Sequence, residues 1–104
     1  MALETITLPE DENFVRRLRL KLEEYQERYE KPRNPGDKRD SSYKIHVLSS
    51  LLEHGKVDVT DLKGRLIEST EDFDWYLFDQ ACKVINAYCV DDADKIEGGT
   101  GLPE

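Results

Sequence analysis

The sequence predicts an all-α fold, a single-domain bundle of about four helices with the last helix at its centre. Apolar residues recur at spacings of three and four along most of the chain, and capping or helix-breaking residues separate these segments. In the last segment the apolar residues cover roughly 200° of the helix circumference, which indicates neighbours on two sides. We expect helices at about 8–30, 42–54, 60–68 and 71–90, one domain over 1–94, and a disordered acidic tail over 95–104.

The first helix is predicted to begin with a capping box. Thr7 and Glu10 have the spacing at which two side chains cap each other's backbone amides, and Pro9 suits a first helical turn. A heptad seam follows, with apolar residues at alternating spacings of three and four. Such a seam can pack inside the chain or against a second copy, so homo-oligomerisation through residues 8–30 is a candidate interaction. The seam consists of Val15, Leu18, Leu22, Tyr25 and Tyr29.

The connections between the later helices are predicted from turn-forming and capping residues. Residues 31–42 are expected to form a loop, because their Asn-Pro and Pro-Gly steps favour turns. Gly55 is expected to end the second helix, since glycine adopts the left-handed conformation that closes many helices. Residues 57–59 alternate apolar and charged side chains and are expected to be extended. Thr60 should then cap the third helix, and residues 69–70 should cap the fourth.

The charge pattern limits the classes of binding partner. The chain has a formal net charge of −8, and its acidic excess lies toward both ends. This charge disfavours nonspecific binding to nucleic acid or to an anionic membrane. A local basic group occurs within residues 16–39, but Arg19 and Glu23 are spaced to pair along the helix. We therefore interpret this segment as a solvated face of mixed charge.

The two cysteines indicate a reducing compartment. Cys82 and Cys89 lie seven residues apart on one predicted helix, so their Cα atoms should be about 10.5 Å apart, too far for a disulfide. Both lie within the apolar arc, where burial disfavours the reactive thiolate. The sequence shows no signal peptide and no apolar run near the ~18 residues of a membrane span. We expect a cytoplasmic protein without membrane association.

No catalytic or metal-binding motif is evident. His46 and His54 lie eight residues apart, far in sequence from both cysteines, and this spacing is not that of a zinc site. The glycines of the tail precede no helix that could hold a phosphate. We expect neither an enzyme nor a bound cofactor or metal.

Two alternative functions are considered. Residues 43–90 resemble the outline of helix-turn-helix domains, which implies a DNA-binding regulator. The element that would enter the major groove, however, begins with the carboxylates of residues 71–74, which repel phosphates. Direct nucleic-acid binding is therefore disfavoured.

The second alternative is an enzyme. An E-E-x-x-E motif at residues 23–27 and an E-x-x-D motif at residues 71–74 resemble the helix-borne carboxylates of all-α nucleotide pyrophosphohydrolases. That resemblance implies Mg²⁺-dependent hydrolysis with oxygen ligands. The second motif has no basic residue beside it for a phosphate, which departs from what this chemistry needs.

The favoured hypothesis is a small acidic module that binds another protein. Asp72, Trp75 and Asp79 fall together on the predicted fourth helix. A lone tryptophan at the edge of an apolar arc is usually packed at the core boundary, and the alternative is an interface anchor ringed by these carboxylates. The carboxylates would complement a basic surface on the partner, which could itself be a nucleic-acid-binding surface. A small acidic protein that binds a basic surface could be an inhibitor or an adaptor, and it resembles antitoxins, immunity proteins and phage inhibitors in this respect.

Overall fold

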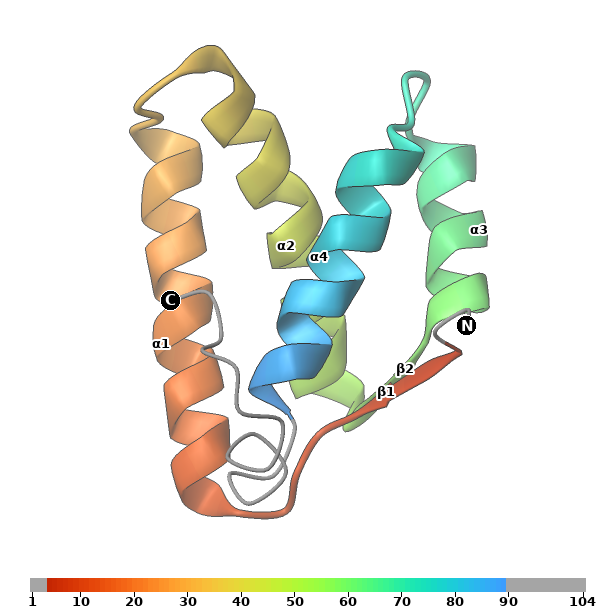
Figure 1. Cartoon of the computed structure of the whole chain (residues 1–104). Helices are drawn as coiled ribbons and strands as arrows, with labels where there is room; N and C mark the ends of the chain where they lie inside the picture. Colours follow the sequence, from red (N-terminus) through yellow and green to blue (C-terminus); the bar gives the residue numbers. More distant parts are fainter. Residues whose placement is uncertain (1–3, 90–104) are drawn as a thin grey trace.

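The computed structural model describes residues 4–89 and shows four helices and a two-stranded sheet (Figure 1). The predicted all-α bundle is confirmed. The domain limit at residue 94 and the disordered tail at 95–104 lie outside the described residues. The elements in order are β1 (Thr5–Thr7), α1 (Glu12–Glu30), α2 (Pro35–His54), β2 (Lys56–Asp58), α3 (Val59–Ser69) and α4 (Trp75–Tyr88).

The helix α2 forms an antiparallel hairpin with α1 and also packs against α4. The helix α4 lies between α1 and α3 in the view of Figure 1, whereas the helix that contacts the most elements is α2, which packs against α1, α4 and β2. The buried side chains of α4 face the rest of the core, as its wide apolar arc indicated. The buried apolar residues of the described chain are Ile6, Leu18, Tyr25, Tyr43, Val47, Leu48, Leu51, Val57, Leu62, Leu66, Phe78, Ala81, Cys82 and Ile85.

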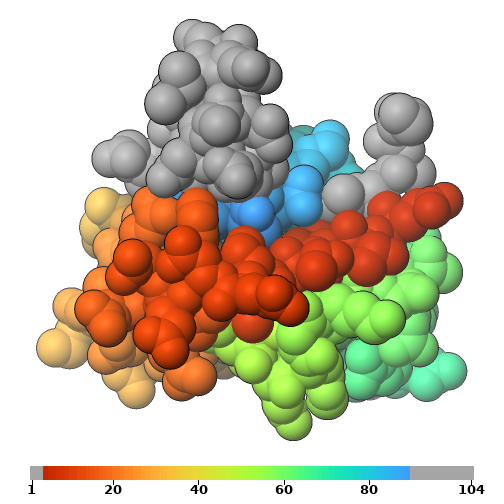
Figure 2. Space-filling model, turned by 90° about the horizontal axis from the view of Figure 1, so that it is seen from below, coloured from red at the N-terminus to blue at the C-terminus, as the bar shows by residue number. Residues whose placement is uncertain are grey.

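The two strands close the lower end of the bundle. β1 and β2 pair antiparallel, with Ile6 opposite Val57, and both of these side chains are buried. Figure 2 shows β1 stretched across this end of the molecule, between the start of α1 and the segment of β2 and α3. The extended segment predicted near residues 57–59 is thus found at Lys56–Asp58. Its partner strand was not predicted.

The predicted capping box of the first helix is wrong. Thr7 belongs to β1, and the helix begins at Glu12, where the carboxylate of Asp11 accepts a hydrogen bond from the Asn13 amide at 2.7 Å. The strand is the more stable structure here because it buries Ile6 completely. A helix that reached back to residue 8 would break the pairing of β1 with β2. The amide of Leu8 instead bonds to the carbonyl of Gly55 at 2.9 Å.

The predicted loop over residues 31–42 is mostly helix. α2 begins at Pro35, because the side chain of Asn34 accepts a hydrogen bond from the Asp37 amide at 2.9 Å and acts as the N-cap. Proline at the first helical position has no amide to leave unpaired, so the Pro-Gly step does not exclude a helix here. Gly55 ends α2 as predicted, with a φ of 80°.

The last two helices are capped by aspartates instead of the predicted hydroxyl residues. The carboxylate of Asp58 accepts from the Asp61 amide at 3.0 Å, and that of Asp74 accepts from the Leu77 amide at 3.1 Å. The fourth helix therefore begins at Trp75, and residues 70–74 form a turn before it. Of residues 4–89, no helix is long and apolar enough to cross a membrane.

Candidate functional site

The predicted interface residues lie at the start of α4, and we call Asp72, Trp75, Tyr76 and Asp79 the Trp75 surface. The Trp75 side chain is 58% exposed, and its neighbour Tyr76 is 69% exposed. The Asp72 carboxylate is almost fully exposed, and Asp79 lies one turn along the helix from Trp75, also exposed. Sequence reasoning missed Tyr76, although its position on the polar side of the predicted fourth helix was a signal that it would face solvent.

The Trp75 ring is held against the core by other aromatic rings. Phe73 lies edge-on to Trp75, with ring centroids 5.5 Å apart, and edge-on to Tyr43 at 5.7 Å. Phe73 also contacts the buried ring of Phe78 at 5.5 Å. Such contacts restrict the rotation of each ring. Trp75 is therefore an exposed side chain with an ordered base, which suits an interface anchor.

The turn before α4 is fixed from α2. The Tyr43 hydroxyl accepts a hydrogen bond from the Asp74 amide at 2.6 Å. The Arg39 guanidinium donates to the Asp72 carbonyl and lies 3.4 Å from the Asp72 carboxylate. It also lies 3.9 Å from the carboxylate of Asp74. Two residues of α2, four positions apart, thus set the direction in which the Trp75 surface points.

Cations of the same chain already contact this surface. The Lys63 ammonium lies 4.7 Å from the centroid of the Trp75 ring, a cation–π contact. Lys83 pairs with Asp79 at 3.0 Å. The Lys83–Asp79 pair is exposed and the Trp75 ring is 58% exposed, so both contacts can be exchanged for contacts with a cation of a partner. The surface therefore has the chemistry to receive lysine or arginine.

A hollow of about 360 Å³ adjoins the Trp75 surface. Asp72 and Arg39 line it, together with three residues of α1 and α2, Tyr29, Ser42 and His46. The same three residues also border a second hollow, of about 770 Å³, between α1 and α2. The two hollows are therefore neighbours, bordered in common by Tyr29 of α1 and by Ser42 and His46 of α2.

The heptad seam of α1 packs mainly inside the chain. Leu18 and Tyr25 are buried and Val15 and Leu22 are half-buried, while Tyr29 is 42% exposed. The seam faces α2, with which α1 makes the most extensive contact between elements. Self-association through this seam stays a prediction, and Tyr29 is its most accessible member.

The cysteines and histidines are placed apart from one another. Burial, with a smaller contribution from the Asp79 carboxylate, raises the pKa of the Cys82 thiol to about 12, so this thiol is protonated at neutral pH. The exposed His46 lies on α2 and borders both hollows, while His54 ends α2. Within residues 4–89, no three histidine, cysteine, aspartate or glutamate side chains are placed to hold a metal ion.

The motifs behind the alternative functions lie on different elements of the fold. The acidic motif at 23–27 lies on α1, whereas that at 71–74 lies in the turn before α4. The predicted groove-reading element, α4, buries Phe78, Ala81 and Ile85 in the core. Comparison with protein-family models, with curated proteins and with solved structures finds no match to this chain.

Proposed function

We propose that this chain is a protein-binding module, acting as an inhibitor or adaptor, whose Trp75 surface docks on a basic surface of another protein. The observation that carries the proposal is the exposure of Trp75 and Tyr76, which are adjacent and are 58% and 69% exposed. Large aromatic side chains on a monomer surface are the usual anchors of protein interfaces. Their position on an aspartate-capped helix start keeps them rigid.

The expected partner is basic because of the charges around these rings. Asp72 and Asp79 flank Trp75, and no cation of residues 4–89 lies within ion-pair distance of the neighbouring Glu68 or Glu71. A partner's lysine or arginine side chains could replace Lys63 on the Trp75 face and Lys83 beside Asp79. Long-range attraction to an acidic surface would also speed association and make it sensitive to salt. We place this activity in the cytoplasm, since neither Cys82 nor Cys89 forms a disulfide.

The test compares variants of the immobilised chain in capture from native lysate at about 50 mM and about 500 mM salt, salts that span strong and weak screening. A true partner should be a basic protein that wild type retains at low salt and releases at high salt. Trp75→Ala should lose it, while Ile67→Ala, which removes a 41% exposed apolar side chain that belongs to neither the Trp75 surface nor α1, should retain it.

The captured protein is then titrated directly. Trp75 is the only tryptophan of the chain, so its emission reports on this surface without labelling, provided that the partner's own emission is subtracted. Truncation of an anchoring tryptophan costs about 2 kcal/mol or more, so Trp75→Ala should weaken binding at least about thirtyfold. Equal retention by wild type and Trp75→Ala, or no basic protein retained at low salt, would refute the proposal.

A further inference from the structure

The outer face of α1 carries charges that find no partner within the described chain. Counting 100° per residue, Arg16, Leu20, Glu23, Glu27 and Glu30 fall on the side of α1 opposite its buried residues. Arg19 lies at the edge of the same side. Leu20 is 55% exposed, which is the highest exposed fraction of any large aliphatic side chain in residues 4–89. We call these six residues the α1 outer face.

The absence of ion pairs on this face contrasts with the rest of the molecule. The spacing of Arg19 and Glu23 predicted a pair along the helix, but no salt bridge of residues 4–89 includes any charged residue of the α1 outer face. The neighbouring pair that does form joins Lys21 to Glu24, at 3.3 Å. Exposed ion pairs along a helix contribute little to the stability of the fold. The five charged side chains of the α1 outer face therefore remain available to another molecule.

The charges are arranged by sign along the helix. Both arginines lie in the N-terminal half of α1, the three glutamates lie in the C-terminal half, and Leu20 lies between them. A helix face with this order is complementary to itself when a second copy runs in the opposite direction. Such an arrangement satisfies both copies at once, because a two-fold axis relates them.

We propose that the occupant of the α1 outer face is a second copy of this chain, packed antiparallel on it. A two-fold axis midway between Leu20 and Glu23 places Arg16 of each copy opposite Glu27 of the other. Because a helix rises 1.5 Å per residue, the two Leu20 side chains are then offset by only about 4.5 Å along the axis. The apolar contact thus lies at the centre, with ion pairs on both sides of it.

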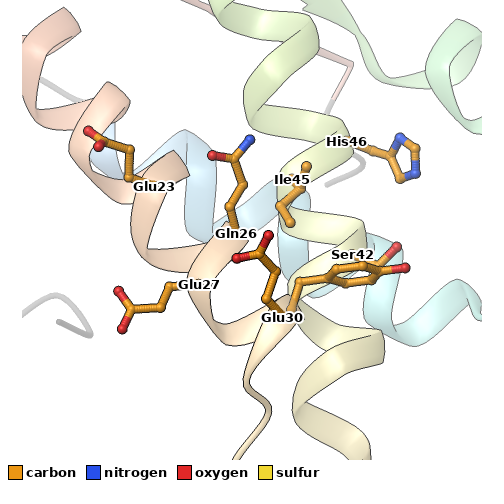
Figure 3. Close-up of a pocket in the computed structure, with 8 residues that line it drawn as sticks. Glu23, Gln26, Glu27, Glu30, Ser42, Ile45 and His46 are labelled. Atoms are coloured by element: carbon orange, nitrogen blue, oxygen red, sulfur yellow. The ribbon is translucent and has the colours of Figure 1, made fainter.

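A hollow beside this face has room for the arginines of the second copy. The hollow of about 770 Å³ lies between α1 and α2. Figure 3 shows Glu23, Gln26, Glu27 and Glu30 on the α1 side of it, with His46 on the α2 side. A guanidinium of the second copy that enters this hollow would meet a lining that includes three glutamates, and arginine favours bidentate pairing with a carboxylate.

The dimer should be weak and sensitive to salt. Each copy has a formal net charge of −8, so overall repulsion opposes the local pairing. At about 0.1 M salt the screening length is about 10 Å, so repulsion between more distant charges is already largely screened, and further salt mainly weakens the exposed ion pairs. This pairing uses a different face from the heptad seam, and it does not depend on the Trp75 surface.

The test uses charge reversal and its complementation. One variant, Arg16→Glu with Arg19→Glu, has an entirely acidic outer face. The other, Glu23→Arg with Glu27→Arg, has a mainly basic one. Wild type should dimerise in sedimentation equilibrium between about 10 µM and about 1 mM protein at about 50 mM salt, and less at about 500 mM. Each variant alone should dimerise at least about tenfold more weakly, and an equimolar mixture of both should form the heterodimer.

A matched control separates local pairing from net charge. Glu53→Arg with Glu68→Arg makes the same change of net charge as Glu23→Arg with Glu27→Arg, at exposed positions outside the α1 outer face, and this variant should dimerise at least as well as wild type. All substituted residues are exposed, so circular dichroism should show unchanged helix content. Three results would overturn the proposal: a monomeric wild type at about 1 mM, variants that dimerise like wild type, or a mixture no more associated than its components.

Discussion

Replacing Tyr43 by phenylalanine tests how the Trp75 surface is held in place. The change removes one oxygen and keeps the buried ring, so the edge-on contact with Phe73 at 5.7 Å remains. What is lost is the acceptor for the Asp74 amide, 2.6 Å away in a partly buried position. A partly buried amide left without an acceptor costs about 1 to 1.5 kcal/mol. For a domain of this size that lowers the midpoint of thermal unfolding by roughly 4–10 °C.

Two assays and one control make this prediction specific. Thermal and urea unfolding give the change in stability, and hydrogen exchange should show faster exchange of the Asp74 amide. Tyr76→Phe removes the same atom from a side chain that is 69% exposed, and its effect should stay within about 0.5 kcal/mol. An unchanged hydrogen-exchange rate of the Asp74 amide in Tyr43→Phe would show that the Tyr43 hydroxyl does not hold the turn. Equal destabilisation by Tyr76→Phe would show the same.

Other predictions test the core and the buried thiol. Ile6→Ala should destabilise the fold by about 2–4 kcal/mol in urea unfolding, because Ile6 is completely buried, whereas Thr5→Ala at an exposed position of β1 should change stability by less than about 0.5 kcal/mol. Equal effects would argue that β1 does not complete the core. In a Cys89→Ser background, Cys82 should react with a thiol reagent at pH 8 only after unfolding, because burial keeps its pKa near 12. Since the unfolded thiol ionises near pH 9 and the folded one does not, stability should also fall as pH rises from about 9 toward about 12, and the fall should be smaller in Cys82→Ala.

Sequence patterns predicted the helices better than their ends. The fourth helix was recognisable because Phe78, Ala81, Cys82 and Ile85 recur at helical spacing, and all four are buried. Its start was misplaced because a serine, a threonine and several aspartates all precede it, and each type can cap a helix. Only the fold decides among them, since the Asp74 amide lies within reach of Tyr43, 31 residues earlier.

The N-terminal strand could not be predicted from local sequence. Ile6 is a single apolar residue between threonines, and three residues carry too little pattern to distinguish a strand from a loop. Its burial depends on Val57, about 50 residues away, and on the turn at Gly55 that brings β2 beneath it. The sequence placed Trp75 at the edge of the apolar arc, and the structure shows it 58% exposed. A residue at such an edge has one side free of the core.

The two proposed surfaces are connected through residues 39–46 of α2. Arg39 and Tyr43 on one side of this segment hold the turn that presents Trp75, while Ser42 and His46 border the hollow beside the α1 outer face. These residues occupy successive turns of one helix, so neither surface can shift without moving the helix that supports the other. The surfaces themselves lie on different elements, the outer side of α1 and the start of α4. Pairing through α1 would therefore leave both Trp75 surfaces accessible, and a dimer would present two docking sites to a partner with repeated basic surfaces.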